Sequence, residues 1–389
     1  MFMNKLRKWI LFFLVIQLAL ACKKKDTNPT ISAFNSFDRT GMLTNIGNNI
    51  IVPSYTSFAS KADSLYIVAQ QFVATPNSTT LSNFQNQWLQ VNLEWKSCEV
   101  YNFGPALTNN NAVNIQSNFV VTSSSVESVI TSTPTAYDST FVPKQATGIR
   151  GISVIEYLLF DPTNGNTAIL NNYTANGTAS QQRLNYLKGL VQDIKSNAHG
   201  LLNAWLPSGG NYIQTFISAN GNDINSSISF LVNQIVYLND YMKNYKIGRP
   251  MGIRINASNG SPLPTYVETY YSSHAFDCMT ANFKSIDNLF FGVGNNGIKE
   301  SGFSDLITAV NGQTSTGQPL ASVMRQRLDS LYFQINAFNI PLEQAVVNSG
   351  STNQLNTLYT SSKQLLVLTK LDMVNSLGVI LTTTDNDGD

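Results

Sequence analysis

Charged side chains are scarce in this chain of 389 residues, where Asp, Glu, Lys and Arg make up 12% of the sequence. Ordinary soluble domains carry roughly 25% charged residues. The 24 basic and 23 acidic residues nearly cancel, to a formal net charge of +1, and no basic stripe follows residue 25. Because Lys and Arg contacts to phosphate supply most nucleic-acid affinity, nucleic acid is not expected as a partner.

Cysteine and histidine are also few, with three and two copies. Only Cys98 and Cys278 lie beyond residue 22, so a disulfide scaffold is excluded and one bridge is the maximum. Both lie in apolar helical patterns, where a buried, unreactive thiol is the usual state. We expect His199 at the surface and His274 at a helix start. Two histidines cannot build a multi-histidine zinc or copper site, which leaves oxygen ligands and hard cations or ferric iron.

Familiar catalytic motifs are missing too. The sequence has no glycine-rich phosphate loop, no Gly-x-Ser-x-Gly elbow, no His-Glu-x-x-His pair and no Cys-x-x-Cys. What is present is ample material for a core, since 43% of the residues are hydrophobic and 11% are aromatic. This composition excludes intrinsic disorder. At about 100–200 residues per domain, the length predicts two domains.

A long apolar run occurs once, over residues 9–21, directly after three basic residues. This order is that of an export signal, and the run is shorter than the roughly 20 residues that a membrane-spanning helix needs. Its end resembles a bacterial lipobox before Cys22, although Ala replaces the usual Leu three positions before the cysteine. We therefore expect a signal peptide over 1–21, lipidation of Cys22, a linker over 22–36, and a membrane-anchored protein of the cell envelope. Ordinary secretion with an incidental cysteine is the alternative.

Apolar residues recur at helical spacing through nearly the whole chain, which predicts an all-α fold. In residues 82–103, for example, Trp88, Val91, Trp95 and Cys98 trace one stripe at spacings of three and four. The further stripes that predict long helices span 181–205, 224–245, 266–291, 320–338 and 355–377. Clusters of Gly, Pro, Asn and Ser separate them, and alternating strand patterns are few and short.

A short sequence echo suggests an internal duplication. Trp95-Lys96-Ser97 with Glu99 leads into Phe-Gly, and 188 positions later Phe283-Lys284-Ser285 with Asp287 leads into Phe-Gly again. Chance over so few positions is the alternative. The echo predicts two related helical bundles, residues 37–219 and 220–389, the second ending in an acidic tail over residues 385–389.

The strongest candidate for a site is Glu156, a carboxylate inside the nearly continuous apolar helix predicted after Gly151. A carboxylate taken out of water needs a partner or stays protonated with a raised pKa. Arg150 and Ser153 are the nearest candidate partners in sequence. A structural Glu that ties helices together is the alternative to a functional one. Glu99 and Asp287, at echo-related positions, could converge on one site or merely border a partly wet groove.

The segment Gly151 to Phe160 resembles the imelysin-type signature, Gly-x-His-x-x-Glu followed by an aromatic residue and Leu-Leu. The segment from Trp95 through Glu99 to Phe-Gly-Pro, and the last residues of the chain, resemble that family as well. The resemblance implies an all-α protein of two bundle-like halves, exported or lipid-anchored, from a family named for a peptidase activity (class M75) with relatives associated with iron uptake. Ser153 stands where the signature histidine would be, so a His–Glu metallopeptidase site is not expected.

The leading hypothesis is a lipid-anchored, imelysin-like binding protein that serves iron acquisition, with a ligand groove between the two bundles. Glu156 would be the central acid and the candidate ligand for iron or another hard cation. Ser153 and Arg150 would orient it or contact an anionic ligand, with Glu99 and Asp287 in secondary places. The alternatives are an M75-type metallopeptidase that uses Glu156 with oxygen ligands only, and a structural, adhesin-like module.

Overall fold

The computed structural model describes residues 29–382, apart from 118, 133–136, 138–139, 176 and 254–258. In these ranges every regular element is helical, and extended pairing is limited to two isolated bridges, Val293 with Lys299 and Gln313 with Pro319. The predicted all-α class is confirmed. The predicted signal peptide, the lipidation site Cys22 and the acidic tail lie outside the described residues.

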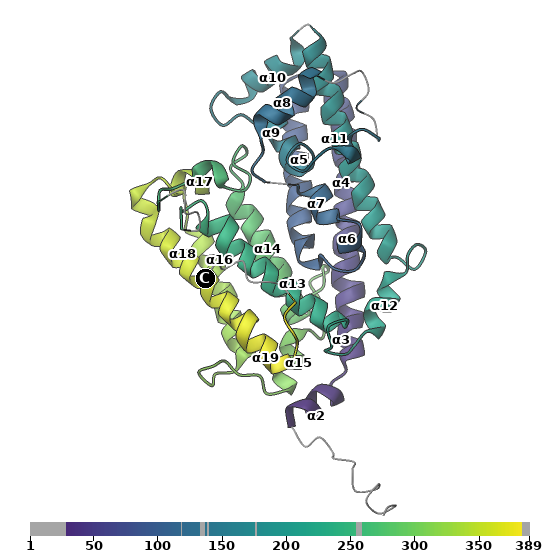
Figure 1. Ribbon diagram of the computed structural model, residues 1–389, viewed down its shortest axis with the longest axis vertical. Coiled ribbons are helices and arrows are strands. Elements are labelled where there is room, and N and C mark those ends of the chain that lie inside the picture. The colour runs from purple at the N-terminus through teal and green to yellow at the C-terminus, as the bar shows by residue number, and fades with distance from the viewer. Residues whose placement is uncertain are drawn as a thin grey trace, which may run out of the picture.

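The chain forms two consecutive sets of helices (Figure 1). The N-terminal set comprises α2 (Pro29–Ser36), α3 (Arg39–Asn45), the π-helix η1 (Ile46–Ile51), α4 (Val52–Ala74), α5 (Ser78–Cys98), the 3₁₀ turn η2 (Glu99–Tyr101), α6 (Pro105–Thr108), α7 (Asn111–Ile115), α8 (Ser123–Ser132), η3 (Val142–Lys144), α9 (Ile152–Leu159), α10 (Gly165–Thr174), α11 (Thr178–Trp205) and α12 (Tyr212–Ser218). The C-terminal set comprises α13 (Ser227–Tyr241), the π-helix η4 (Met242–Gly248), η6 (Pro264–Tyr266), α14 (Ala275–Phe291), α15 (Phe303–Ala309), α16 (Leu320–Asn336), α17 (Leu342–Ala345), η7 (Ser349–Ser351), α18 (Thr352–Val367), the π-helix η8 (Leu368–Met373) and α19 (Val374–Leu377).

The N-terminal set is organised around α4, which packs along both α5 and α11 (Figure 1). Helix α5 starts at a capping box, where the Asn77 side chain accepts hydrogen bonds from the N–H groups of Thr79 and Thr80. Its predicted stripe is buried, with Trp88 and Val91 fully inaccessible. The helix is followed by Gly104 at φ 54°, where a Cβ atom would lie 2.3 Å from Cζ of Tyr212. The Phe-Gly pair therefore ends this helical segment by backbone conformation and close packing.

The C-terminal set packs α18 against α13 and α16, and its helix α14 lies against α5 of the N-terminal set. This contact between α5 and α14 joins the two sets (Figure 1). Gly292 ends α14 in the left-handed conformation at φ 68°, at the position that the echo pairs with Gly104. The division near residue 220 and the duplication itself stay predictions.

One predicted helix starts nine residues late. The apolar pattern predicts a helix from residue 266, whereas α14 begins at Ala275. The preceding segment turns instead, with Thr269 at φ 56° and Ser273 at φ 64°. Such values are costly for residues that carry a Cβ atom, so tertiary contacts hold this turn against local preference.

The cysteines and histidines are placed as expected. Cys98 and Cys278 are buried and free, and burial raises the pKa of both thiols. His274 is the residue before α14 and contacts Asp277. His199 is about half exposed, with its Nε2 atom 3.0 Å from Asp63. No helix within the described ranges has both the length and the apolar character needed to span a membrane.

Candidate functional site

Glu156 lies on α9, which begins at the signature glycine. Gly151 has φ 89°, and a Cβ atom there would lie 2.8 Å from the carbonyl oxygen of Ile115. Only glycine suits this turn, which directs α9 into the core with the carboxylate 1% exposed. The Trp88 indole donates a 3.0 Å hydrogen bond to the carbonyl of Ile152 and fixes the start of α9 against α5.

The carboxylate of Glu156 is held by the turn that precedes α14. Its Oε1 atom accepts hydrogen bonds from the backbone N–H and the hydroxyl of Ser272, both at 2.8 Å. Burial raises the pKa of Glu156 to about 8, while the two Ser272 donors oppose the shift. Glu156 is therefore protonated at neutral pH, as a carboxyl group without a cationic partner should be.

Neither residue predicted to partner Glu156 does so. Arg150 precedes the Gly151 turn and points to α11, where its guanidinium pairs with Asp193 at 2.6 Å and donates to the carbonyl of Pro143. The Ser153 hydroxyl accepts a 3.0 Å hydrogen bond from the side-chain amide of Gln116. Sequence proximity was a poor guide, since the true partner of Glu156 lies 116 positions away.

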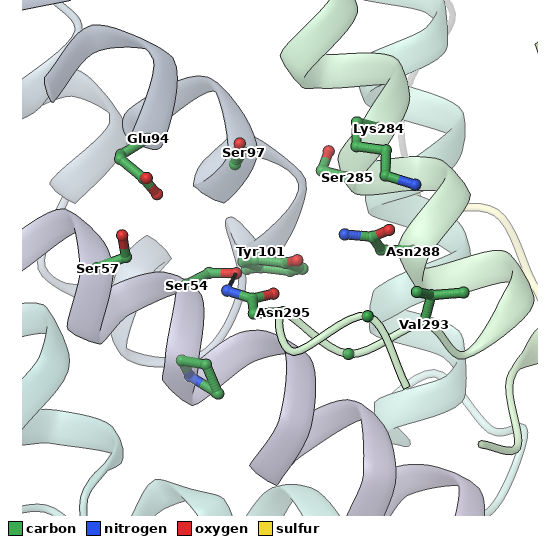
Figure 2. A pocket seen from close by; sticks show the side chains of 13 residues that line it. Ser54, Ser57, Glu94, Ser97, Tyr101, Lys284, Ser285, Asn288, Val293 and Asn295 are labelled. Atoms are coloured by element: carbon green, nitrogen blue, oxygen red, sulfur yellow. Dashed lines mark hydrogen bonds between the residues drawn. The ribbon is translucent and has the colours of Figure 1, made fainter. Parts of the chain in front are cut away.

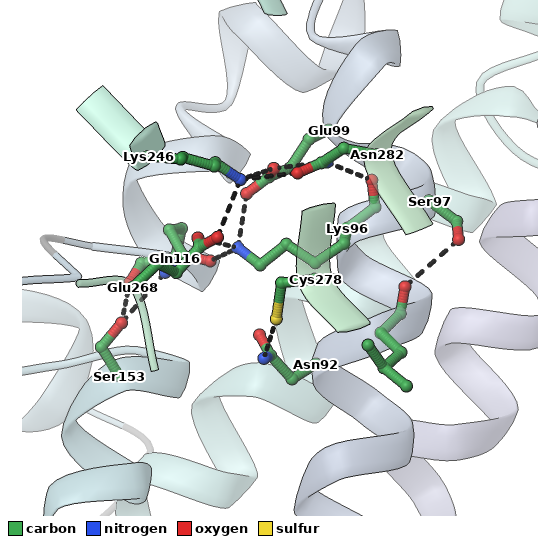
Figure 3. Close-up of polar contacts among 11 residues, drawn as sticks. Asn92, Lys96, Ser97, Glu99, Gln116, Ser153, Lys246, Glu268, Cys278 and Asn282 are labelled. Atoms are coloured by element: carbon green, nitrogen blue, oxygen red, sulfur yellow. Dashed lines mark hydrogen bonds and ion pairs between the residues drawn. The ribbon is translucent and has the colours of Figure 1, made fainter. Parts of the chain in front are cut away.

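Ser153 borders a cluster of four buried charges, two lysines and two glutamates, in which each ammonium contacts both carboxylates (Figure 3). We call this cluster the charge ring; it consists of Lys96, Glu99, Lys246 and Glu268. Lys96 Nζ lies 2.6 Å from Glu99 and 2.8 Å from Glu268. Lys246 Nζ lies 2.9 Å from Glu99 and 3.0 Å from Glu268. Both lysine side chains are completely inaccessible.

Neutral amides extend the charge ring to both helix sets. Asn282 on α14 accepts a 2.7 Å hydrogen bond from Lys246 and donates to Glu99 and to the carbonyl of Lys96, each at 2.8 Å. The side-chain oxygen of Gln116 accepts from Lys96, and its amide nitrogen reaches Ser153. The ring thus links α5, η4 and α14 to the signature helix α9.

The electrostatics of the charge ring favour the charged forms of Glu99 and Lys96. Burial opposes the charge on Glu99, but the Lys246 and Lys96 ammonium groups lower its pKa to about 2. Likewise, burial favours a neutral Lys96, but Glu268 and Glu99 raise its pKa above the ordinary value. Two positive and two negative charges leave no excess charge, which is the condition under which buried ions are tolerated.

Glu99 and Asp287 do not converge on one site. Asp287 accepts from Arg325 at 2.5 Å and from Lys284 at 3.1 Å, and neither of these cations belongs to the charge ring. Each echo-related acid instead pairs with a lysine three positions before it, Lys96 with Glu99 and Lys284 with Asp287. The two positions keep a local ion pair and differ in everything around it.

Sequence reasoning missed most of the charge ring. Lys96, Lys246 and Glu268 were not predicted as site residues, and neither were Gln116 and Asn282. Glu156 stands out because it is the one charge in an apolar run, whereas Lys96 has Glu94 and Glu99 close by in sequence and Lys246 has Lys243 and Arg249. The criterion that singles out Glu156 therefore does not single out the two lysines.

The donor set does not suit a metal ion. Both ring carboxylates are neutralised by ammonium groups, Glu156 is protonated, and a hydroxyl stands at the signature histidine position. Across the described ranges, no group of three or more His, Cys, Asp or Glu side chains is placed to hold a metal ion. The expectation of a cation ligated by Glu156 therefore has no support in the chemistry of these residues.

A cavity of about 220 Å³ opens beside the charge ring, between the two helix sets. Glu99 and Gln116 contribute polar groups to its lining, and Tyr237 and Tyr241 of α13 and Trp95 of α5 contribute aromatic rings. The tyrosine rings stack, with centroids 6.0 Å apart and an interplanar angle of 15°. We call this space the ring-side cavity; it is lined by Trp95, Glu99, Asn102, Ala112, Val113, Gln116, Ser117, Tyr237, Leu238 and Tyr241.

Comparison with known proteins shows which family and which solved structures this chain is similar to. The family model described as Imelysin (Peptidase M75) matches residues 51–369, and no curated protein matches the chain. A candidate iron-regulated protein A precursor from Parabacteroides distasonis ATCC 8503 shares the fold with a TM-score of 0.70 and 18% identity, over 92% of this chain and 97% of that one. An imelysin-like protein from Psychrobacter arcticum 273-4 does so with a TM-score of 0.63 and 18% identity, over 89% and 97% of the two chains. The match to more than half of the chain shows that this protein belongs to the imelysin family.

Proposed function

We propose that this protein is a lipid-anchored binding protein of the bacterial cell envelope that serves iron acquisition and takes its ligand in the ring-side cavity. The observation that carries the proposal is the charge ring. Its carboxylates are already paired with lysines, close to Ser153, which stands at the signature histidine position. A cavity whose wall carries Glu99, a carboxylate that two lysines already neutralise, suits binding better than hydrolysis, because the ring leaves no carboxylate free to hold a metal or activate water.

The lining of the ring-side cavity suggests what would bind. Tyr237 and Tyr241 offer aromatic surface, with the buried Trp95 behind the lining, and Glu99 and Gln116 offer hydrogen-bonding groups. Aromatic pairs prefer offset-stacked or edge-to-face contact with another ring. A bare iron ion would find no ligand set among these residues, whereas iron carried by an aromatic chelator would find a stacking surface. We therefore propose a small ferric chelate with an aromatic ring as the cargo.

The comparisons support the iron-related part of this proposal. One structural relative is named as a candidate iron-regulated protein, and its fold extends over 92% of this chain. Support for the envelope location comes from the sequence, where a predicted export signal and Cys22 precede the first described helix, α2. The family name points to a peptidase, but the replacement of the signature histidine by Ser153 argues against that chemistry in this chain.

Equilibrium dialysis tests the proposal. The purified protein is dialysed against the ferric complex of 2,3-dihydroxybenzoate and, separately, against ferric citrate, which has no aromatic ring. We expect saturable iron retention from the aromatic complex and much weaker retention from citrate. Tyr237→Ala removes a half-exposed ring from the cavity mouth and should weaken retention about threefold to tenfold, the value of one aromatic contact.

Phe333→Ala is the matched control, because Phe333 is an aromatic residue on α16 that is 77% exposed and does not line the ring-side cavity. This variant should retain the aromatic complex as the unmodified protein does. Equal retention of both iron complexes, no saturable retention, or equal behaviour of the two variants would each contradict the proposed cargo site.

A further inference from the structure

A second and larger cavity lies between α4, α5 and α14 (Figure 2). Its volume is about 510 Å³, within the range of roughly 300–1,000 Å³ that ligand pockets occupy. Helix α4 contributes Ser54 and Ser57, α5 contributes Glu94 and Ser97, and α14 and the following loop close the far side. We call this space the serine cavity.

The serine cavity is separate from the charge ring. Glu94, Ser97 and Tyr101 are spaced by three and four, which places them on one face of the α5–η2 segment. Lys96 and Glu99, between them in sequence, point to the ring instead. No residue of the charge ring lines the serine cavity, and the linings of the serine cavity and the ring-side cavity share no residue.

The floor of the serine cavity is rigid and neutral. Ser54, Tyr101 and Ser285 are buried, and Ser54 is fixed because it donates to the carbonyl of Ile50 at 2.7 Å and accepts from Asn295 at 3.3 Å. Ser97 and Ser285 are 188 positions apart, at echo-related places on α5 and α14, and line the cavity from opposite walls. The two helix sets thus present matching hydroxyls to the same space (Figure 2).

One wall of the serine cavity carries a charge that no cation in the described ranges balances. The carboxylate of Glu94 points into the space (Figure 2) and pairs with no cation in the described part of the chain. The cation on the opposite wall, Lys284, is engaged by Asp287 at 3.1 Å and its side chain is 54% exposed. Ser57, beside Glu94, has a hydroxyl that makes no hydrogen bond within the described ranges.

We propose that the serine cavity binds a small hydrophilic ligand that carries a primary ammonium group, such as an amino sugar or a free amino acid. The ammonium would pair with Glu94 and supply the missing positive charge, since charge-assisted hydrogen bonds are roughly twice as strong as neutral ones. Serine hydroxyls and the Asn288 amide, which points into the space (Figure 2), would hydrogen-bond to the polar body of the ligand. Among the described residues of the lining, Tyr101 alone is aromatic, and it is 1% exposed, so they offer no platform for a planar aromatic ligand.

Isothermal titration calorimetry with the purified protein tests this assignment. The probes are glucosamine, L-alanine, and N-acetylglucosamine, in which acetylation removes the positive charge. We expect glucosamine or L-alanine to bind with one site per chain, and the better of the two identifies the ligand class. N-acetylglucosamine should bind at least about tenfold more weakly, because loss of a charge-assisted contact costs about tenfold to a hundredfold in affinity.

Two variants locate the site. Glu94→Gln keeps the size of the side chain but removes its charge, and it should weaken binding of the amine at least about tenfold. Asp63→Asn removes one surface carboxylate from the same helix pair without touching the cavity, because Asp63 contacts Lys195 and His199; it should leave binding unchanged. Unchanged melting curves would confirm that both variants fold. If neither amine binds, or if Glu94→Gln binds as tightly as Asp63→Asn, the assignment is wrong.

Discussion

Replacing Glu156 by Gln should leave stability nearly unchanged below pH 4.5 and should stabilise the protein progressively as pH rises above that value. Glu156 is protonated in the folded protein at neutral pH, with a pKa near 8 against the ordinary 4.5, because burial disfavours its charged form. Glutamine has nearly the same shape, and its side-chain oxygen can accept both hydrogen bonds from Ser272. Below pH 4.5 the carboxyl group is neutral in the folded and unfolded chains, so the variant should match the unmodified protein within about 1 kcal/mol.

The magnitude at higher pH follows from linkage. Between pH 4.5 and 8 the unfolded chain has released the Glu156 proton and the folded protein has kept it, so the free energy of unfolding falls as pH rises. The slope is about 1.4 kcal/mol per pH unit for one proton, which accumulates to about 5 kcal/mol over this window. Glu156→Gln abolishes this contribution. Relative to the unmodified protein, the variant should therefore become more stable as pH rises from 4.5 to 8.

Urea unfolding at half-unit steps from pH 5 to pH 8.5 measures this difference directly. Glu300→Gln is the matched control, since Glu300 is exposed and undergoes the same chemical change; its stability curve should run parallel to that of the unmodified protein. Parallel curves for Glu156→Gln would mean that Glu156 is ionised in the folded state. A loss of about 3–5 kcal/mol at every pH would mean that a buried ion pair had been broken. Either result would refute the account of a neutral, serine-held carboxyl group.

Two further perturbations examine the anchor and the charge ring. Cys22→Ala should move the protein from the membrane fraction to the soluble fraction, and a variant that still pellets after a carbonate wash would show that Cys22 is not the anchor. Lys246→Met leaves two buried carboxylates with one cation and should cost about 3–5 kcal/mol in urea unfolding; adding Glu268→Gln should recover part of that loss, and no recovery would mean that the two residues are not coupled.

The sequence was informative wherever structure depends on neighbours along the chain. Helix α5 follows the predicted stripe because Trp88, Val91 and Trp95 are spaced to fall on one face, and all three are buried. The burial of Glu156 was predictable for the same reason, since its helix offers no polar face to place it on. Burial is also the largest cause of its raised pKa. These features need no knowledge of what packs against them.

The sequence did not predict the backbone conformation where contacts between residues distant in the chain determine it. The apolar pattern after residue 266 favours a helix, yet Thr269 and Ser273 adopt left-handed conformations. This turn delivers Glu268 to the two lysines and the N–H of Ser272 to Glu156. Local propensity amounts to less than about 1 kcal/mol per residue, whereas an unpaired buried charge costs several kcal/mol. The long-range contacts therefore override the helical pattern, and the residues of this segment do not predict those contacts by themselves.

The charge ring also bears on how the two helix sets recognise one another. Lys96 and Glu99 come from the N-terminal set, and Lys246 and Glu268 come from the C-terminal set, so each set contributes one charge of each sign. A shift of one set that brought like charges together would replace attraction by repulsion, and buried repulsion is penalised far more than apolar mismatch. Apolar helix faces alone tolerate shifts, because any hydrophobic residue of similar size can fill the space. Since Gln116 ties Lys96 to the signature helix and Asn282 ties Lys246 and Glu99 to α14, the register that satisfies the ring also fixes the walls of both cavities. The scarce charges of this chain are thus placed where they determine how its two cavities are assembled.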